Sequence, residues 1–197
     1  MYPIHSKYVV HGSSGSGKSA LIELLEESSY NVSVHRKDST REHRPNESPE
    51  GTLDLRFLDQ ATFEKNRKRG KYDIVYEKYG NLYGIRKDQL TEAFENKESH
   101  FLIIRDISAI RQFKYTYPDA KAIYIHADPK SIPERLRERD GMSPKKRQER
   151  TREEYDEYKH NNTLFDHVVL NFWDLEGAAL QMKNIMHKYA KKATINL

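Results

Sequence analysis

The chain has 197 residues, of which 36% are hydrophobic and 32% are charged, and its formal net charge is +4. This length fits one compact domain with an apolar core, and the apolar content excludes a disordered chain. The absence of cysteine excludes disulfides, thiol catalysis and thiolate metal sites. No apolar run approaches the roughly 20 residues that span a bilayer, and the amino-terminal residues lack a signal pattern. We therefore expect a cytoplasmic protein with no membrane partner.

The positive charge suits an anionic partner, and a phosphorylated small molecule accounts for it as well as a nucleic acid does. Short basic clusters occur at residues 35–37, 67–69 and 145–147, and acidic residues interrupt them. Each cluster is typical of a solvated face, so we do not expect a nucleic-acid partner.

Strands and helices alternate along most of the chain. Residues 8–11 are β-branched and aromatic and end at a glycine, which predicts a strand. Residues 19–27 carry leucine and isoleucine at helical spacing, which predicts a helix. Further strands are expected at 101–105, 122–126 and 167–170, and helices at about 88–97, 132–139, 144–159 and 175–192. This alternation predicts an α/β fold, a parallel sheet with helices on both faces.

Two segments depart from this pattern. Residues 31–86 are polar and rich in turns, with short strand-like pieces such as 72–77, and we interpret them as a small mixed-sheet insertion. Residues 139–152 have no apolar stripe and many basic side chains, so we expect them outside the core.

Residues 12–19 match the phosphate-binding pattern G-x-x-x-x-G-K-[S/T], the P-loop, at every specified position. Glycines let backbone N–H groups close around phosphate oxygens, and the following helix adds partial positive charge. Lys18 is expected on the β- and γ-phosphates, and the Ser19 hydroxyl on Mg²⁺. The alternative is a plain turn rich in glycine and serine, but the pattern lies between a predicted strand and a predicted helix. The expected ATP site comprises Gly12, Ser13, Ser14, Gly15, Ser16, Gly17, Lys18, Ser19 and Ala20.

A triphosphate site also needs a carboxylate at the end of a buried strand, to organise Mg²⁺ and its water ligands. Asp106 follows the predicted strand 101–105 and is the candidate, acting on the metal through water. The alternative is an aspartate that caps the following turn. The acidic pairs at 153–154 and 156–157 fall on a highly charged helix, and we expect them to be solvated.

Beyond the P-loop and Asp106, motifs from Tyr8 to about Met186 make the chain similar to the guanylate kinase family of nucleoside-monophosphate kinases. Residues 39–47 resemble its T-R-x-P-R-x-G-E motif, residues 79–84 its y-x-G-N-x-Y-G hairpin, residues 135–150 its lid, and residues 165–171 its F-D-x-V-I-x-N strand.

The resemblance implies a role for individual residues. Arg41, Arg44 and Tyr83 match residues that bind the phosphate of the acceptor monophosphate. Arg139 and Arg150 match lid arginines that reach the transferring phosphoryl group, and Asn171 falls in the ATP site. The implied architecture is a single P-loop NTPase-type domain over residues 1–197. Its parts are a core (1–30, 87–138 and 160–197), a mixed-sheet monophosphate-binding insertion (about 31–86) and a helical lid (about 139–159).

The chain departs from the family where the acceptor base is bound. Leu55 replaces a phosphate-binding tyrosine, and Ile85 replaces a base-contacting serine. The base-reading glutamate of the family aligns with Ile74 or its neighbour Asp73, and of the family's two aspartates at the strand end only Asp106 is present. A buried site rejects a wrong base by leaving polar groups unpaired, so guanine selection should weaken unless Asp73 substitutes.

These residues predict an ATP-dependent nucleoside-monophosphate kinase, with GMP as the first candidate acceptor, Mg²⁺ as cofactor, and a monomer or homodimer as the assembly. One alternative is a kinase for another nucleotide or a sugar phosphate. Another is a non-catalytic nucleotide-binding module whose altered acceptor site contacts a protein. Lys18, Ser19 and the lid arginines argue against the module, because a pure binder does not need them.

Overall fold

A five-stranded parallel sheet forms the centre of the part of the chain that the structure describes, in the order β2-β7-β1-β8-β9. The structure is a computed structural model and describes residues 7–28, 31–45, 47–95, 98–132, 136, 143–172 and 174–195. The strands of this sheet are β1 (Lys7–His11), β2 (Val32–Val34), β7 (Ser99–Ile103), β8 (Lys121–Ala127) and β9 (His167–Asn171).

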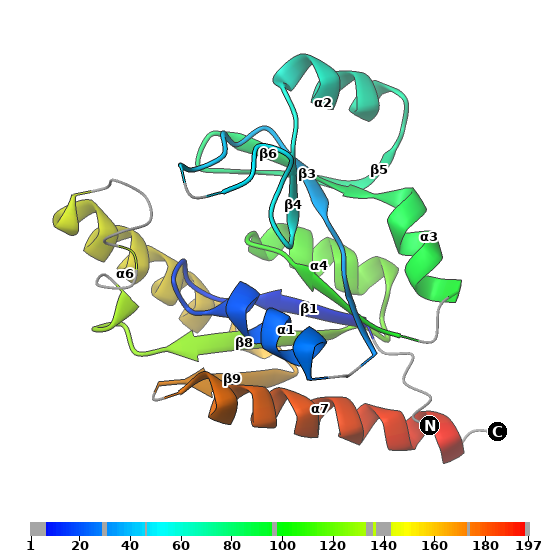
Figure 1. Cartoon of the computed structure of the whole chain (residues 1–197), viewed down its shortest axis with the longest axis vertical. Coiled ribbons are helices and arrows are strands. Elements are labelled where there is room, and N and C mark those ends of the chain that lie inside the picture. Colours follow the sequence, from blue (N-terminus) through cyan, green and yellow to red (C-terminus); the bar gives the residue numbers. More distant parts are fainter. Residues whose placement is uncertain are drawn as a thin grey trace.

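Helices cover both faces of this sheet, which is why its central strands are apolar on both sides. Tyr8 and Val10 of β1 pack against α1 (Lys18–Glu27) and α7 (Leu175–Ile195), which lie along one face (Figure 1). Val9, between them, faces the other way, toward α4 (Ile107–Thr116). The predicted α/β architecture is confirmed, although the sequence did not lead us to expect α4.

A second, mixed sheet lies above the first in Figure 1, in the order β4-β3-β6-β5. Its strands are β3 (Lys37–Ser39), β4 (Leu55–Phe57), β5 (Tyr72–Lys78) and β6 (Asn81–Arg86). Helix α2 (Gln60–Lys68) separates β4 from β5, and α3 (Lys87–Glu95) leads back to β7. The mixed sheet was expected from residue 31 onward, but β2 pairs with β7 in the central sheet, so the mixed sheet begins at β3.

Helix α6 (Pro144–His160) is strongly charged, yet one of its side chains packs against the central sheet. Its start agrees with the sequence, since the Ser143 side chain accepts a hydrogen bond from the Lys146 N–H and Pro144 is the first helical residue. The Tyr158 ring stacks on Tyr124 of β8 at 3.6 Å between centroids. A short 3-10 turn, η1 (Asn162–Leu164), connects α6 to β9. The predicted helix at 132–139 lies mostly outside the described residues, and Arg139 lies wholly outside them.

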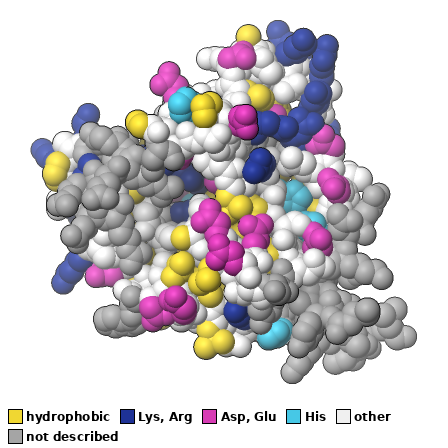
Figure 2. Space-filling model, viewed as in Figure 1, with side chains coloured by type: hydrophobic (Ala, Val, Ile, Leu, Met, Phe, Trp, Pro, Cys, Tyr) yellow, Lys and Arg dark blue, Asp and Glu magenta, His cyan; other side chains and the backbone are white. Residues whose placement is uncertain are grey.

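The basic cluster at residues 67–69 is exposed, as expected. Lys and Arg side chains gather over α2 at the top of Figure 2, where Lys65, Arg67 and Lys68 form the basic last turn of the helix. None of the helices in the described part of the chain is long and apolar enough to cross a membrane.

Candidate active site

Gly12, Gly15 and Gly17, in the loop between β1 and α1, all have a positive φ, and at two of them a Cβ would also clash with a neighbouring residue. Gly12 has φ 152°, and a Cβ there would lie 2.5 Å from the Ile125 carbonyl oxygen. Gly17 has φ 89°, and its Cβ would lie 2.4 Å from the Asn171 side chain. Asn171 donates a hydrogen bond from Nδ2 to the Ser16 carbonyl oxygen at 2.9 Å. Asn171, predicted in the ATP site, thus supports the backbone of the phosphate-binding loop.

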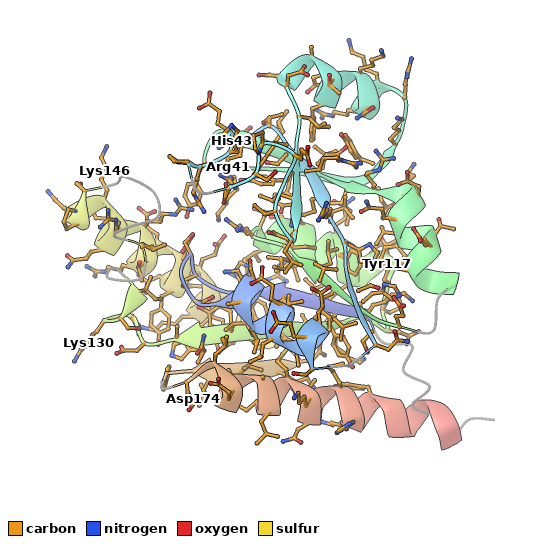
Figure 3. The ribbon with its side chains drawn as sticks, in the orientation of Figure 1. Arg41, His43, Tyr117, Lys130, Lys146 and Asp174 are labelled. Atoms are coloured by element: carbon orange, nitrogen blue, oxygen red, sulfur yellow. The ribbon has the colours of Figure 1, made fainter. Side chains whose placement is uncertain are left out.

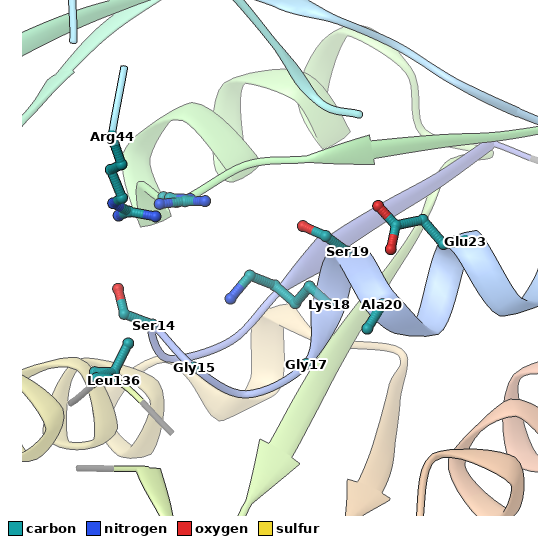
Figure 4. Close-up of a pocket in the computed structure, with 10 residues that line it drawn as sticks. Ser14, Gly15, Gly17, Lys18, Ser19, Ala20, Glu23, Arg44 and Leu136 are labelled. Carbon is teal, nitrogen blue, oxygen red and sulfur yellow. The ribbon is translucent and has the colours of Figure 1, made fainter. Parts of the chain in front are cut away.

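The Lys18 side chain folds back along this loop. Its Nζ donates to the carbonyl oxygens of Gly12 and Ser13, at 2.7 and 2.8 Å, and to Ser16 Oγ at 3.2 Å. Lys18 and its neighbours border a cavity of about 290 Å³, and Figure 4 shows Arg44 above it. The lining residues are Ser14, Gly15, Gly17, Lys18, Ser19, Ala20, Glu23, Arg44, Arg105 and Leu136. We call it the loop cavity.

A second cavity, of about 150 Å³, adjoins the first. It is lined by Ser19, Glu23, Arg41, Glu47, Thr52, Leu53, Asp54, Leu55 and Arg105. Ser19, Glu23 and Arg105 line both cavities. We call this the arginine cavity, because Arg41 and Arg105 face it from opposite elements.

Arg41 and Arg44 are held by one carboxylate. Glu47 accepts hydrogen bonds from Arg41 NH2 at 2.8 Å and from the Arg44 backbone N–H at 2.9 Å. Burial would raise the pKa of Glu47, but the bonds from Arg44 and Arg41 outweigh it and lower that pKa. The two predicted acceptor residues line different cavities, Arg41 the arginine cavity and Arg44 the loop cavity.

Two other predicted acceptor residues do not line either cavity. Tyr83 is 3% exposed and stacks on Tyr76, with ring centroids 5.1 Å apart. Asp73 accepts a hydrogen bond from the Tyr117 hydroxyl at 3.0 Å, and Figure 3 shows Tyr117 well away from Arg41. Asp73 therefore does not substitute for the missing glutamate in this structure. Leu55, Ile74 and Ile85, at the altered base-site positions, are buried in the core.

Arg105 was not predicted to take part in the site. It follows β7 and faces Asp54, whose carboxylate Oδ2 also lies 3.1 Å from the Nζ of buried Lys37. Burial would raise the pKa of Asp54, but Lys37 and Arg105 lower it far below its usual range. The Nε of Arg105 has no hydrogen-bond partner among the described residues. An arginine at the end of a buried strand beside a P-loop is the signal that could have identified it.

Asp106 has the alternative role that the sequence left open. Its Oδ1 accepts a hydrogen bond from the Ala109 N–H at 2.8 Å and caps α4, and Asp106 lines neither cavity. Ser19 and Glu23 are the residues with side-chain oxygen atoms that line both cavities. An alcohol and a carboxylate oxygen suit Mg²⁺, which in such sites binds few protein ligands and completes its shell with phosphates and water.

Helix α6 also reaches the phosphate-binding loop. Glu154, expected to be solvated, has a side chain that is only 12% exposed. Its carboxylate accepts hydrogen bonds from the Ser14 N–H at 2.7 Å and the Ser14 hydroxyl at 3.2 Å. Arg150, one turn earlier, donates from NH2 to Ser14 Oγ at 3.0 Å. The predicted lid arginine therefore contacts Ser14, which lines the loop cavity, and the acidic run beside it is partly buried.

Comparisons with known proteins agree with this arrangement. The sequence model of the guanylate kinase family matches residues 5–189. The guanylate kinase of Nitrosomonas europaea is 30% identical over 180 residues, covering 91% of this chain and 87% of the relative. That of Chromobacterium violaceum is 32% identical, covering 93% and 86%. The crystal structure of guanylate kinase from Anaplasma phagocytophilum superposes with a TM-score of 0.68 at 21% identity, over 94% of this chain and 86% of that one, and supports the fold. The chain belongs to the guanylate kinase family.

Proposed function

We propose that this protein is an ATP-dependent nucleoside-monophosphate kinase, which converts ATP and GMP into ADP and GDP. The observation that carries the proposal is the junction of the two cavities. The loop cavity has the phosphate-binding backbone and Lys18, and the arginine cavity has the cations that an acceptor phosphate needs. Because Ser19, Glu23 and Arg105 line both, donor and acceptor phosphates would meet between them.

The proposed reaction needs charge and position, with no covalent intermediate. The acceptor phosphate is largely a dianion at pH 7, so its oxygen attacks the γ-phosphorus without a general base. Lys18 and the loop N–H groups bind the donor phosphates, and Arg41 orients the attacking group. Arg44, Arg105 and Arg150 stand around the point of transfer, where charge spreads over the transferred oxygens.

Mg²⁺ is the cofactor implied for this site, and bound with ATP it neutralises phosphate charge. Ser19 would hold it directly, and Glu23 directly or through water. This assignment replaces Asp106, whose carboxylate is engaged in capping α4.

A second acceptor class is favoured by one observation. Ile74 and Ile85 are 1% and 2% exposed, so the two positions expected to contact the base are part of the apolar core. The arginine cavity is about 150 Å³, below the roughly 300–1,000 Å³ of most ligand cavities. An acceptor smaller than a nucleotide, such as a sugar phosphate, fits these dimensions.

Release of ADP, measured by a coupled assay over a panel of acceptors, tests both candidates. The panel contains GMP, AMP, CMP, UMP and pentose and hexose phosphates, with the Lys18→Met variant as the control for contaminating kinases. We expect GMP to be used, with less rejection of AMP than the roughly 10⁴-fold that a fully polar base site achieves. Turnover with sugar phosphates alone would favour the second candidate. ATP binding without transfer to any acceptor would favour the non-catalytic module.

A further inference from the structure

The tip of the β5–β6 hairpin has an unusual backbone. Tyr79 has φ 53°, and it is the only residue other than glycine with a positive φ in the described part of the chain. A bulky residue is disfavoured in this left-handed conformation, and glycine or asparagine is preferred there. A tyrosine at such a position points to a role for its side chain.

The Tyr79 side chain contacts two residues of α6. Its ring lies beneath the Arg150 guanidinium, with Cζ 3.9 Å from the ring centroid. Its hydroxyl donates a hydrogen bond to Glu154 Oε1 at 3.0 Å. The preceding residue strengthens the junction, because Lys78 Nζ lies 3.0 Å from Glu157 Oε2. The hairpin and α6, about 75 residues apart, therefore meet through an aromatic ring and two carboxylates.

The same two residues of α6 contact the phosphate-binding loop. Arg150 NH2 donates to Ser14 Oγ, and Glu154 Oε2 accepts from the Ser14 N–H. Glu154 Oε1 also lies 3.4 Å from Arg150 Nε. The guanidinium is thus fixed on three sides: by the ring of Tyr79, the carboxylate of Glu154 and the hydroxyl of Ser14.

We propose that Tyr79 is a positioning residue that holds the Arg150 guanidinium against Ser14, which lines the loop cavity. This inference rests on the proposed function, in which Arg150 contacts the transferring phosphoryl group. An arginine side chain loses much rotamer freedom when it is fixed. Because the Tyr79 ring already holds the Arg150 side chain before the substrates bind, this conformational entropy is not lost on binding. The ring leaves the N–H groups of Arg150 available, because it contacts the face of the guanidinium.

The placement also joins two substrate-binding parts. Tyr79 belongs to the hairpin that pairs with β3, and β3 leads into the loop that carries Arg41. Arg150 belongs to α6. A displacement of the hairpin on acceptor binding would therefore be transmitted to the arginine through the Tyr79 ring.

The test compares Tyr79→Asn with Tyr79→Phe. Asparagine tolerates a positive φ, so Tyr79→Asn removes the ring without adding backbone strain, and its melting temperature should equal or exceed that of the wild type. Tyr79→Phe keeps the ring and removes only the bond to Glu154. We expect kcat to fall about tenfold in Tyr79→Asn, between the scales of an exposed and a desolvated cation–π contact, because the Tyr79 residue is 47% exposed. KM for ATP should change less than twofold. Tyr79→Phe should retain at least half of kcat. Tyr115→Ala, at an exposed tyrosine of α4, is the control.

Two further measurements locate the effect at Arg150. In Arg150→Ala, expected to lose about 10² in kcat, adding Tyr79→Asn should cause no further loss; a further tenfold loss overturns the proposal. The Arg150 Nε–Hε resonance can be assigned by its absence from the NMR spectrum of Arg150→Ala. The ring current of residue 79 should shift it upfield in the wild type and in Tyr79→Phe. In Tyr79→Asn it should move back to the chemical shift of an arginine without a stacked ring. An unchanged resonance also overturns it. The NMR measurement does not depend on turnover. If the protein had no kinase activity, the proposed function would be contradicted, but the contact between Tyr79 and Arg150 would still be tested by the resonance.

Discussion

The carboxylate of Glu154 accepts a hydrogen bond from the backbone N–H of Ser14 at 2.7 Å, across 140 residues of sequence. Backbone N–H groups of this loop are the groups that bind phosphate oxygens in a P-loop. Burial would raise the pKa of Glu154, but Arg150, the Ser14 N–H and Lys18 outweigh it and lower that pKa. The carboxylate is therefore ionised at pH 7 and competes with a phosphate for one donor.

Glu154→Gln should consequently bind ATP more tightly. The amide oxygen can still accept from Ser14, but it lacks the charge that makes the carboxylate bond about twice as strong and that repels phosphate. We expect the Kd for ATP to fall roughly fivefold, corresponding to about 1 kcal/mol, as measured by titration calorimetry. Glu153→Gln, at an exposed position of the same helix, makes the same change of charge without this contact. An equal gain in both variants would mean that net charge is responsible.

Lys18→Met should abolish phosphoryl transfer, because no other side chain brings a positive charge to the donor phosphates from within the loop. The structure adds an effect on stability. Lys18 is 6% exposed and bonds to the carbonyl oxygens of Gly12 and Ser13, so methionine leaves buried acceptors without a donor. We expect the free energy of unfolding to fall by about 1–3 kcal/mol, measured by urea denaturation. Turnover within tenfold of wild type would contradict a role for Lys18 in transfer.

The phosphate-binding loop could be predicted from the sequence because its determinants are contiguous. Gly12 and Gly17 permit the backbone conformation of the loop, and Lys18 extends its side chain within the same loop. The spacing of these residues in the sequence is enough to identify them. The alternation of apolar strands with helices likewise predicted four of the five strands of the central sheet, all except β2. The start of the helix predicted at 144–159 is confirmed for the same local reason, because Pro144 is its first residue and the Ser143 side chain caps it.

Contacts between distant segments could not be predicted in this way. Glu154 lies on a helix without an apolar stripe, and its burial arises only because α6 meets the loop at Ser14. Asp73 was expected at the acceptor site, but the β5–β6 pairing shifts register between Tyr72 and Ile74, and Asp73 bonds to Tyr117 instead. The role of Asp106 depended on whether a helix follows it at once, and the sequence did not lead us to expect α4.

Arg41→Ala and Arg44→Ala should have different kinetic effects, although the sequence predicted the same role for both. Arg41 lines the arginine cavity but not the loop cavity, so its loss should raise KM for the acceptor by roughly 30-fold, equivalent to about 2 kcal/mol for a charge-assisted contact. Arg44 lines the loop cavity with Lys18, so its loss should also weaken ATP binding in the absence of acceptor. Each variant is the control for the other, because each removes one of the two arginine side chains that bond to the Glu47 carboxylate. Identical effects on ATP and acceptor would place both arginines in one subsite.

Arg105→Gln should lower kcat more than either KM. Arg105 lines both cavities, so it can contact the transferring group after both substrates have bound. We expect kcat to fall by on the order of 10²-fold, the lower part of the range that arginines supply to phosphoryl transfer. The matched variant is Arg56→Gln, whose guanidinium pairs with Asp38 in the mixed sheet and lines neither cavity. A change confined to the KM for the acceptor would make Arg105 a binding residue only.

Stability should fall in mild acid because of His11, the residue before the loop. Its imidazole is 4% exposed and Nδ1 lies 2.8 Å from the Ile104 carbonyl oxygen. Burial, aided by the charge of Lys18, lowers the pKa of His11 from 6.5 to about 4. The unfolded chain therefore binds a proton at this residue between pH 6.5 and 4 that the folded chain does not. The folded state is destabilised as the pH falls through that window, and the effect is absent above pH 6.5.

At pH 5 this linkage amounts to about 2 kcal/mol for His11 alone. His35, whose pKa burial also lowers to about 4, adds to it. Urea denaturation at pH 7 and pH 5 measures the loss. His11→Asn places an amide N–H near the position of Nδ1 and does not titrate, so its loss between the two pH values should be smaller than that of the wild type by about 2 kcal/mol. His160→Asn, at an exposed histidine, should lose as much as the wild type. If His11→Asn lost as much as His160→Asn, the acid sensitivity would have to arise at His35 or elsewhere.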